Sequence, residues 1–245
     1  MSLHLLRFDP DMARSALWFA SEKLLPRNAE DGGYAWHALL AAAFGTALAP
    51  KPFHLHARRN RPVQLLAYSS EDPATLLSQA QSFADPQVFA ALRLGQSTGI
   101  AAKPMPAFTP GRRLGFSLRV RPTVRSDRDG DRTKTRERDA YLAALDATTL
   151  DAPPDRAEVY LAWTTAHLEK GGVKVISARI DGHERVETLR RNDKRDLKPV
   201  QGHAASVAGI LEVSDAERFH ALLARGIGRH RGFGYGMLLL SPPGA

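Results

Sequence analysis

Apolar and polar residues follow two regular patterns along the first half of the chain. Apolar side chains occupy every second position in short segments, as in half-buried strands, and every third or fourth position in longer ones, as in amphipathic helices. The predicted strands are 3–8, 53–58, 63–68 and a short, proline-interrupted edge strand within 98–108. The predicted helices are a region that contains Trp18 and ends near Pro26, a segment over 34–44, and a segment from Asp72 to about Phe83. The element order is therefore β-α-β-β-α-β.

The second half repeats this element order. Its predicted strands are 114–121, 173–180, 206–213 and 235–240, and its predicted helices are 140–145, 156–168 and 214–225, the last with a capping box of Ser214 and Glu217. Residues 125–139 are dense in Arg and Asp and lack an apolar face, so we predict an exposed loop there. The fold class is predicted to be α+β, with two tandem ferredoxin-like units at residues 1–109 and 110–245 and no visible sequence repeat.

The composition narrows the classes of function. The chain has no cysteine, which excludes disulfides, thiolate zinc sites and cysteine nucleophiles. It has no apolar run long enough to cross a bilayer and no cleavage site at its start, so we expect no membrane association and a cytoplasmic location. The net charge of +8 makes nucleic acid the leading class of partner, although a basic protein-interaction module is an alternative.

A glycine-rich run near the C-terminus is the first candidate site. Glycines recur there at 226, 228, 232, 234 and 236, and arginines stand at 225, 229 and 231. Glycine lets a backbone approach a ligand closely, and guanidinium groups match phosphate oxygens, so the run suits a phosphodiester chain. It follows a helix and precedes a strand, which is the reverse of a dinucleotide-binding fingerprint. A glycine-rich turn with a strand bulge is the alternative.

Several motifs carry a resemblance to a known family. Gly226 to Arg229 and Phe233 to Leu239, preceded by Gly209 to Ala216, resemble the corresponding block of the CasE-type endoribonucleases of the Cas6 superfamily, which process CRISPR RNA. Gly33-Tyr34-Ala35-Trp36-His37 is similar to the family's Tyr-x-x-His helix, and 111–124 occupies the place of the strand that opens its second domain. The resemblance implies two tandem ferredoxin-like domains, which agrees with the element order.

The resemblance implies a metal-independent endoribonuclease that acts on CRISPR repeat RNA hairpins. The RNA 2'-OH would attack the phosphate and leave a 2',3'-cyclic phosphate and a 5'-OH. His37 is the candidate for proton transfer, because imidazole titrates near neutrality, and Tyr34 lies one helical turn earlier. Without the resemblance, both residues would be interpreted as core residues. Arg229 and Arg231 are candidates for stabilising charge on the phosphorus, or for clamping phosphates.

The remaining candidates concern RNA binding. His230 with Gly228, Gly232 and Gly234 would contact RNA in the loop. Arginines and one lysine would contact the repeat stem; they are Arg119, Arg121 and Arg125 along one strand face, and Arg190, Arg191, Lys194 and Arg195 in a basic segment between two strands. His54 and His56 share a strand face, but two ligands are too few, so neither a metal nor a cofactor is expected.

One departure from the family leaves an alternative open. The strand that opens the second half ends in Arg121-Pro122, where an Asn-Pro pair is common in the family. A repeat processor of a type IV system, in which arginines carry more of the catalysis, is therefore an alternative, as is a noncatalytic subunit that only holds the hairpin. In each case we expect the RNA hairpin, and other subunits of a CRISPR effector complex, as partners.

Overall fold

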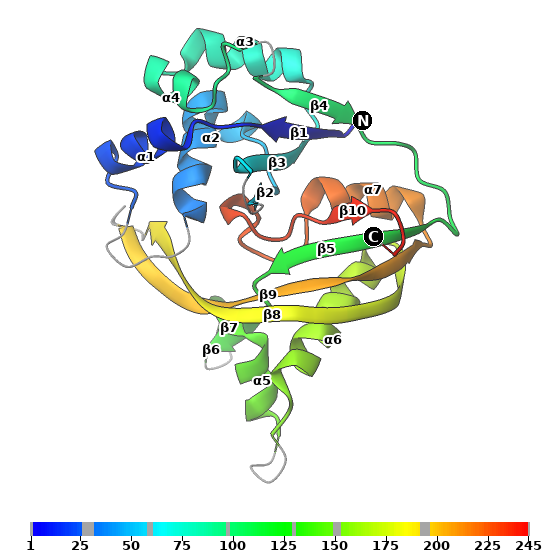
Figure 1. Cartoon of the computed structure of the whole chain (residues 1–245). Coiled ribbons are helices and arrows are strands. Elements are labelled where there is room, and N and C mark those ends of the chain that lie inside the picture. The colour runs from blue at the N-terminus through cyan, green and yellow to red at the C-terminus, as the bar shows by residue number, and fades with distance from the viewer. Residues whose placement is uncertain are drawn as a thin grey trace.

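The computed structural model describes residues 2–25, 32–57, 61–96, 99–128, 131–148, 153–191 and 197–244. Two four-stranded antiparallel sheets and one two-stranded hairpin make up its β-structure. The first sheet lies with its helices at the top of Figure 1, and the second sheet lies below it and carries a helical extension at the bottom.

The first unit has the strand order β2-β3-β1-β4, with every neighbouring pair antiparallel. Its elements are β1 (His4–Phe8), α1 (Met12–Ser21), α2 (Gly33–Leu48), β2 (Phe53–His56), β3 (Gln64–Ser69), α3 (Pro73–Phe83), α4 (Pro86–Ala91) and β4 (Ala101–Pro104). The sequence analysis did not predict α4, a short helix that begins after the capping side chain of Asp85.

The second unit has the equivalent order β10-β5-β9-β8. Its elements are β5 (Arg113–Val120), β6 (Thr123–Arg128), β7 (Asp131–Asp139), α5 (Ala140–Asp146), α6 (Arg156–Lys170), β8 (Val173–Arg191), β9 (Leu197–Val213), α7 (Ala216–Arg225), the 3-10 helix η1 (Arg231–Phe233) and β10 (Leu239–Ser241). In both units the fourth strand lies beside the first, and the third strand lies between the first and the second. The α+β fold of two tandem ferredoxin-like units is thus confirmed.

Residues 125–139 are not the loop that the charge pattern indicated. Residues 125–128 and 131–139 belong to the antiparallel strands β6 and β7, in which Val124 faces Arg138 and Arg125 faces Glu137. Antiparallel pairing satisfies the backbone N–H and C=O groups whether or not the side chains are apolar, so a hairpin forms without the alternation that usually reveals one.

Three other details differ from the prediction. β8 continues to Arg191, so Arg190 and Arg191 lie in a strand of a long hairpin instead of in a connection. β10 begins at Leu239, after the loop has continued through Tyr235. The N-cap of α7 is Asp215, whose carboxylate accepts a hydrogen bond from the Arg218 backbone N–H at 3.0 Å, so the predicted capping box of Ser214 is wrong.

The two faces of the first sheet contact different halves of the molecule. Leu6 and Phe8 of β1 are fully buried against α2 and α3 in the core of the first unit. Leu3 and Tyr68 belong instead to the core of the second unit, and the Tyr68 hydroxyl donates a hydrogen bond to the Leu238 carbonyl at 2.9 Å. Because side chains alternate along a strand, one face of the first sheet packs in the first unit's core and the other face packs in the second unit's core.

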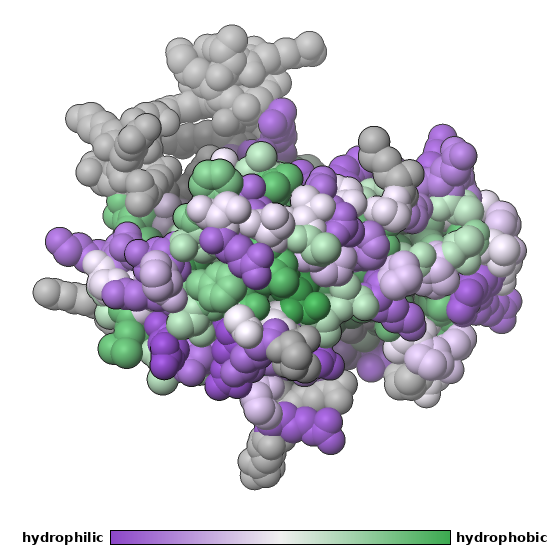
Figure 2. Space-filling model, turned by 90° about the horizontal axis from the view of Figure 1, so that it is seen from above, coloured by the Kyte–Doolittle hydropathy of each residue, from purple (hydrophilic) through white to green (hydrophobic). Residues whose placement is uncertain are grey.

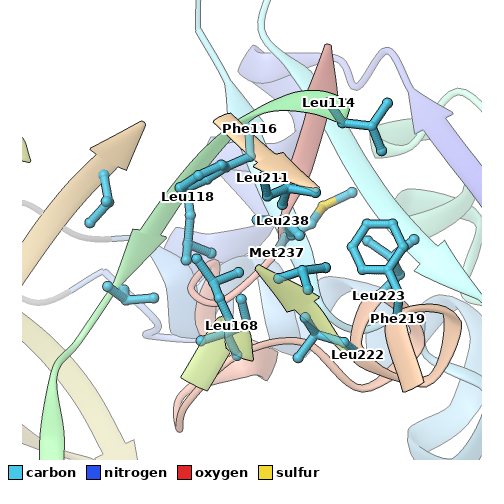
Figure 3. Close-up of a cluster of buried hydrophobic side chains, with 14 of the residues drawn as sticks. Leu114, Phe116, Leu118, Leu168, Leu211, Phe219, Leu222, Leu223, Met237 and Leu238 are labelled. Carbon is cyan, nitrogen blue, oxygen red and sulfur yellow. The ribbon is translucent and has the colours of Figure 1, made fainter. Parts of the chain in front are cut away.

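The second unit's core lies between its own sheet and α6 and α7. Side chains from β5, β9, α7 and the segment before β10 converge there, as Figure 3 shows for Phe116, Leu211, Phe219 and Met237. Complete burial of such a side chain contributes about 1.5–3 kcal/mol. This core fixes both ends of the glycine-rich loop, because α7 precedes the loop and Met237 and Leu238 follow it.

The surface of the first unit is mixed in character. Figure 2, which views the molecule from above, shows hydrophobic and hydrophilic side chains interspersed over this face. Large apolar side chains that are exposed in this unit include Leu17 of α1 and Phe83 of α3. In the part of the chain that the structure describes, no helix is both long and apolar enough to cross a membrane.

Candidate active site

Helix α2 positions His37 and Tyr34. It is apolar on nearly every side, and residues such as Trp36, Leu39 and Leu40 are buried in the first unit's core. A helix that is hydrophobic all round is fixed from all sides by its neighbours. His37 and Tyr34 are only half-buried, and their ring centroids lie 6.3 Å apart. They therefore sit where a rigid element meets the surface.

The glycine-rich loop of the second unit lies directly against these two side chains. The Phe233 ring is 5.3 Å from the His37 ring, in an edge-to-face arrangement, and 5.8 Å from the Tyr34 ring. A Cβ atom added at Gly232 would be 3.3 Å from His37 Nδ1, so the loop backbone passes close to the imidazole. Two motifs from opposite ends of the sequence thus meet at one place. The sequence analysis did not select Phe233, whose ring packs against both candidate residues.

Glycine is required at the base of the loop by close packing. The Ile227 backbone N–H donates to the Gly236 carbonyl at 2.8 Å, and the Gly236 N–H donates to the Arg119 carbonyl at 2.7 Å. Gly236 has φ +74°, and a Cβ there would lie 2.1 Å from the Ile227 carbonyl oxygen. At Gly228, with φ +71°, a Cβ would lie 2.7 Å from the Trp163 ring. These contacts hold the loop in one conformation; its role as a phosphate-binding loop stays a prediction.

A basic groove begins beside His37. It has a volume of about 450 Å³ and is lined by Lys51, Arg225, Arg229, Arg231 and the loop residues up to Phe233. Burial is the main cause that lowers the pKa of His37 below its ordinary value of 6.5, and the positive charge of Lys51 lowers it further. The imidazole is therefore neutral at pH 7 and able to accept a proton.

Lys51 is a candidate that sequence reasoning missed. It is exposed and lies in the connection between α2 and β2, three residues after α2 ends at Leu48. No motif marks it, because a single lysine in a connecting segment is unremarkable in a basic protein. Only the fold shows that this connection returns to the mouth of the groove.

Glu137 of β7 connects the glycine-rich loop to the β6–β7 hairpin. The His230 Nε2 atom is 2.5 Å from one carboxylate oxygen of Glu137, and Arg229 Nε is 3.6 Å from the other. Burial acts to raise the pKa of Glu137, but the hydrogen bond and charge of His230, with the charge of Arg229, outweigh it and lower the pKa to about 2. This residue was missed because its segment was predicted to be a loop.

The loop arginines differ in their surroundings. Arg229 shares Glu137 with His230, whereas one Arg231 terminal nitrogen donates to the Arg225 carbonyl at 2.7 Å. Both guanidinium groups line the groove near Lys51. The structure therefore brings Arg229, Arg231 and His230 to one groove, and His37 contacts two of its lining residues, Gly232 and Phe233.

The three arginines predicted on one strand face do not share a strand. Arg119 is in β5, where it pairs with Glu184 at 2.7 Å and lies 4.9 Å over the Tyr235 ring. Arg121 follows β5 and is only 4% exposed, and one of its nitrogens donates to the Thr188 hydroxyl at 2.8 Å. Arg125 is exposed in β6. The prediction of one shared face is wrong, and the buried position of Arg121 indicates a structural role for it.

The basic segment between two strands is only partly described. Arg190 and Arg191 end β8, but the positions of their side chains are not described, and Lys194 and Arg195 lie outside the described residues. Their contacts with RNA stay predictions.

His54 and His56 lie close together on β2, with ring centroids 6.1 Å apart. Burial, followed by the charges of His56 and Arg119, lowers the pKa of His54 to about 4. Over the described ranges, no group of three His, Cys, Asp or Glu side chains could hold a metal ion.

Comparison with known proteins identifies the family. The family model described as "CRISPR associated protein" matches residues 3–242. The chain belongs to this family of CRISPR-associated proteins. The CasE-type resemblance is thus confirmed, and the curated CRISPR-associated endoribonuclease Cse3 of Thermus thermophilus is 29% identical to this CRISPR-associated protein over 180 residues, 70% of this chain and 74% of that one.

Solved structures show the same fold. The CRISPR endoribonuclease Cse3 bound to a 19-nucleotide RNA matches 99% of this CRISPR-associated protein and 100% of its own chain, with 24% identity and a TM-score of 0.63. A chain of a CRISPR RNA-guided surveillance complex matches 98% and 99%, with 15% identity and a TM-score of 0.51. At these identities the comparison concerns the fold alone.

Proposed function

We propose that this CRISPR-associated protein is an endoribonuclease that cuts precursor CRISPR RNA within the repeat hairpin, without a metal ion. The observation that carries the proposal is the meeting of His37, on the rigid α2, with the glycine-rich loop at a basic groove. RNA supplies the nucleophile as its own 2'-OH, so the protein has to supply proton transfer and positive charge. The charge lines this groove, and His37 contacts Gly232 and Phe233 of its lining.

His37 takes the proton. Because its lowered pKa keeps the imidazole neutral at pH 7, His37 can remove the 2'-OH proton as the oxygen attacks the adjacent phosphorus. The bond from phosphorus to the 5'-oxygen of the next nucleotide breaks, and that oxygen takes a proton from solvent water. The products are a 2',3'-cyclic phosphate and a 5'-OH. Tyr34 and Phe233, in ring contact with His37, hold the imidazole toward the groove.

Positive charge stabilises the five-coordinate phosphorus. Lys51, Arg229 and Arg231 line the groove and can place donors on the non-bridging oxygens. Glu137 forms an ion pair with Arg229 and is hydrogen-bonded to His230. A bound phosphate would compete with Glu137 for Arg229, so Arg231 and Lys51 are the better candidates for contact with the scissile phosphate.

The RNA is proposed to be a hairpin whose stem lies along the second unit. An A-form stem is recognised mainly through its backbone and shape, which basic side chains on a preformed surface can contact. Exposed Arg125 of β6 and the end of the β8–β9 hairpin are the candidates for these contacts. We also propose that the cleaved RNA stays bound and that the protein joins other subunits of a CRISPR effector complex.

The test uses a CRISPR repeat RNA that folds into a hairpin. The full chain is incubated with the hairpin in EDTA, and the products are resolved by end-group analysis. We expect one cut with a 2',3'-cyclic phosphate, and no cut when a 2'-deoxynucleotide precedes the scissile phosphate. Tight binding without any cut would favour the noncatalytic hairpin-binding subunit instead.

The role of His37 needs a matched control. His37→Ala should bind the hairpin as the wild type does and fail to cut it. His220→Ala replaces another half-buried histidine, on α7, and should cut normally. Normal cutting by His37→Ala would exclude His37 as the base.

A further inference from the structure

A second groove borders the same loop arginines as the basic groove beside His37. Its volume is about 310 Å³, and it runs between α6 and the start of the glycine-rich loop. Trp163 and His167 of α6 line it, together with Arg225, Arg229 and Arg231, which also line the groove at His37. The two grooves therefore share one strip of arginines.

The aromatic pair in this groove is held in place. The His167 and Trp163 rings are stacked, with centroids 3.9 Å apart and planes 30° apart, and His167 Nδ1 is 2.8 Å from the Trp163 carbonyl oxygen. The Trp163 indole N–H donates to the Thr123 carbonyl at 3.1 Å, and Gly228 lies against the ring. Trp163 is 9% exposed and His167 is half-buried. Both rings line the groove, and His167 is the more exposed member of the pair, supported by Trp163.

The arginines give the groove its positive charge. Arg225 is exposed, and one Arg231 terminal nitrogen donates to the Arg225 backbone carbonyl, which places the Arg231 guanidinium beside the backbone of Arg225. Burial and the Arg225 charge lower the pKa of Arg231. Two like charges held together are relieved by an anion between them. The groove thus combines an aromatic surface with a site for a phosphate.

We propose that this groove binds an unpaired nucleotide next to the hairpin stem, with its base against His167 and its phosphate on Arg225 and Arg231. The inference rests on the proposed function and extends it from the scissile phosphate to a neighbouring nucleotide. Every base has a face that can stack on an aromatic ring, whereas a paired base in a stem is already stacked. A strand whose phosphate lies beside His37 and continues past Arg231 enters this groove.

The first test needs no variant. Affinity is measured by fluorescence anisotropy for repeat hairpins with a 2'-deoxynucleotide before the scissile phosphate, with and without single-stranded flanks, and with one abasic unpaired position at a time. We expect a flank on one side to strengthen binding, and one abasic position to weaken it roughly tenfold. Equal affinity for the hairpin with and without flanks would overturn this proposal. If the unmodified hairpin is nevertheless cleaved normally, the proposed function stands.

The second test assigns the effect to His167. His167→Ala should remove the preference for the flanked hairpin, with little change in affinity for the unflanked one. His167→Phe keeps an aromatic surface and should retain the preference. His220→Ala is the matched control. If His167→Ala weakens both hairpins equally, or if the abasic penalty persists in it, then the nucleotide does not lie on His167. If no hairpin binds to the wild type, the proposed function itself fails.

Discussion

The two ferredoxin-like units have the same strand order and different extensions. In the first, the central hairpin is short, with β2 and β3 at Phe53–His56 and Gln64–Ser69. In the second, β8 and β9 run over Val173–Arg191 and Leu197–Val213, and the β6–β7 hairpin and α5 are inserted between β5 and α6. The far end of the long β8–β9 hairpin reaches back to the first unit, where Leu197 packs against its core.

This difference indicates that the two units have different roles, which are proton transfer in the first and phosphate binding in the second. The first unit contributes His37 and Tyr34 on a buried helix, where the surrounding core restricts their movement. The second contributes the arginines of the loop and the hairpin that holds the loop through Glu137. A proton acceptor benefits from a fixed position, whereas phosphate contacts need charge spread over a wide surface. The following predictions test that division, from the largest expected effect to the smallest.

Removing the imidazole should affect the rate and not the affinity. His37→Ala is expected to lower the single-turnover cleavage rate by about 10²–10⁴-fold, because general base catalysis contributes on this order. Its Kd for the hairpin, measured by filter binding, should equal that of the wild type. A comparable loss of affinity would mean that His37 belongs to the binding surface, and the division between the units would be wrong.

Removing the ring that joins the units should misplace His37. Phe233→Ala eliminates the contacts with His37 and Tyr34, and a displacement of about 1 Å costs roughly 10²-fold in rate. Single-turnover kinetics would measure the loss. Phe83→Ala removes an exposed ring from α3 and should leave the rate unchanged. An unchanged rate in Phe233→Ala would show that α2 alone orients the imidazole.

Removing a charge from the second unit should weaken binding. Arg231→Gln is expected to lower hairpin affinity and to reduce the slope of log K against log salt by about 1, as for the loss of one phosphate contact. The control is Arg14→Gln in α1 of the first unit, a side chain that is 64% exposed. The affinity of both variants for the hairpin is measured over a range of salt concentrations. Equal slopes for Arg231→Gln and Arg14→Gln would contradict the prediction that Arg231 contacts a phosphate.

Lys51 acts electrostatically on His37 within the first unit, and its removal should shift a pH profile. The charge of Lys51 lowers the pKa of His37. In Lys51→Gln, the apparent pKa of the acidic limb of the pH profile of kcat/KM should therefore rise toward the ordinary histidine value. The wild-type limb is expected below pH 6.5, with activity rising as the imidazole loses its proton. If the acidic limb lies at the same pH in the wild type and in Lys51→Gln, the charge of Lys51 does not lower the pKa of His37.

Glu137 should contribute stability that depends on pH. Its pKa is lowered from 4.5 to about 2 in the folded state, so its contribution is complete above pH 4.5 and is lost as pH falls toward 2. Glu137→Gln should lower the free energy of unfolding by about 1–2 kcal/mol at pH 7 and by less near pH 3. Urea unfolding at both pH values measures this, with exposed Glu22→Gln as control. If Glu137→Gln lowers the free energy of unfolding equally at pH 7 and near pH 3, the ionised Glu137 carboxylate is not the source of the stability.

The outline of the fold was predictable because local patterns determine it. Alternation identified β5, helical spacing identified α2, and Asp72 with Pro73 marked the start of α3. The hairpin of β6 and β7 was missed because backbone pairing does not depend on apolar side chains. Arg121 was assigned to the surface because arginine is rarely buried, and only the packing of β8 and β9 around it provides the partner at Thr188.

The sequence by itself determined the β-α-β-β-α-β order of each unit, the positive charge, and the positions of His37 and of the glycine-rich loop along the chain, but not α4 or the β6–β7 hairpin. The tertiary structure decided which of these meet: the loop at α2, Lys51 at the groove, Glu137 on Arg229, and His167 on Trp163. The physical reason is that local pattern reports how each segment buries its own apolar face. Contacts between distant polar side chains depend on how the two units pack, which no single segment encodes.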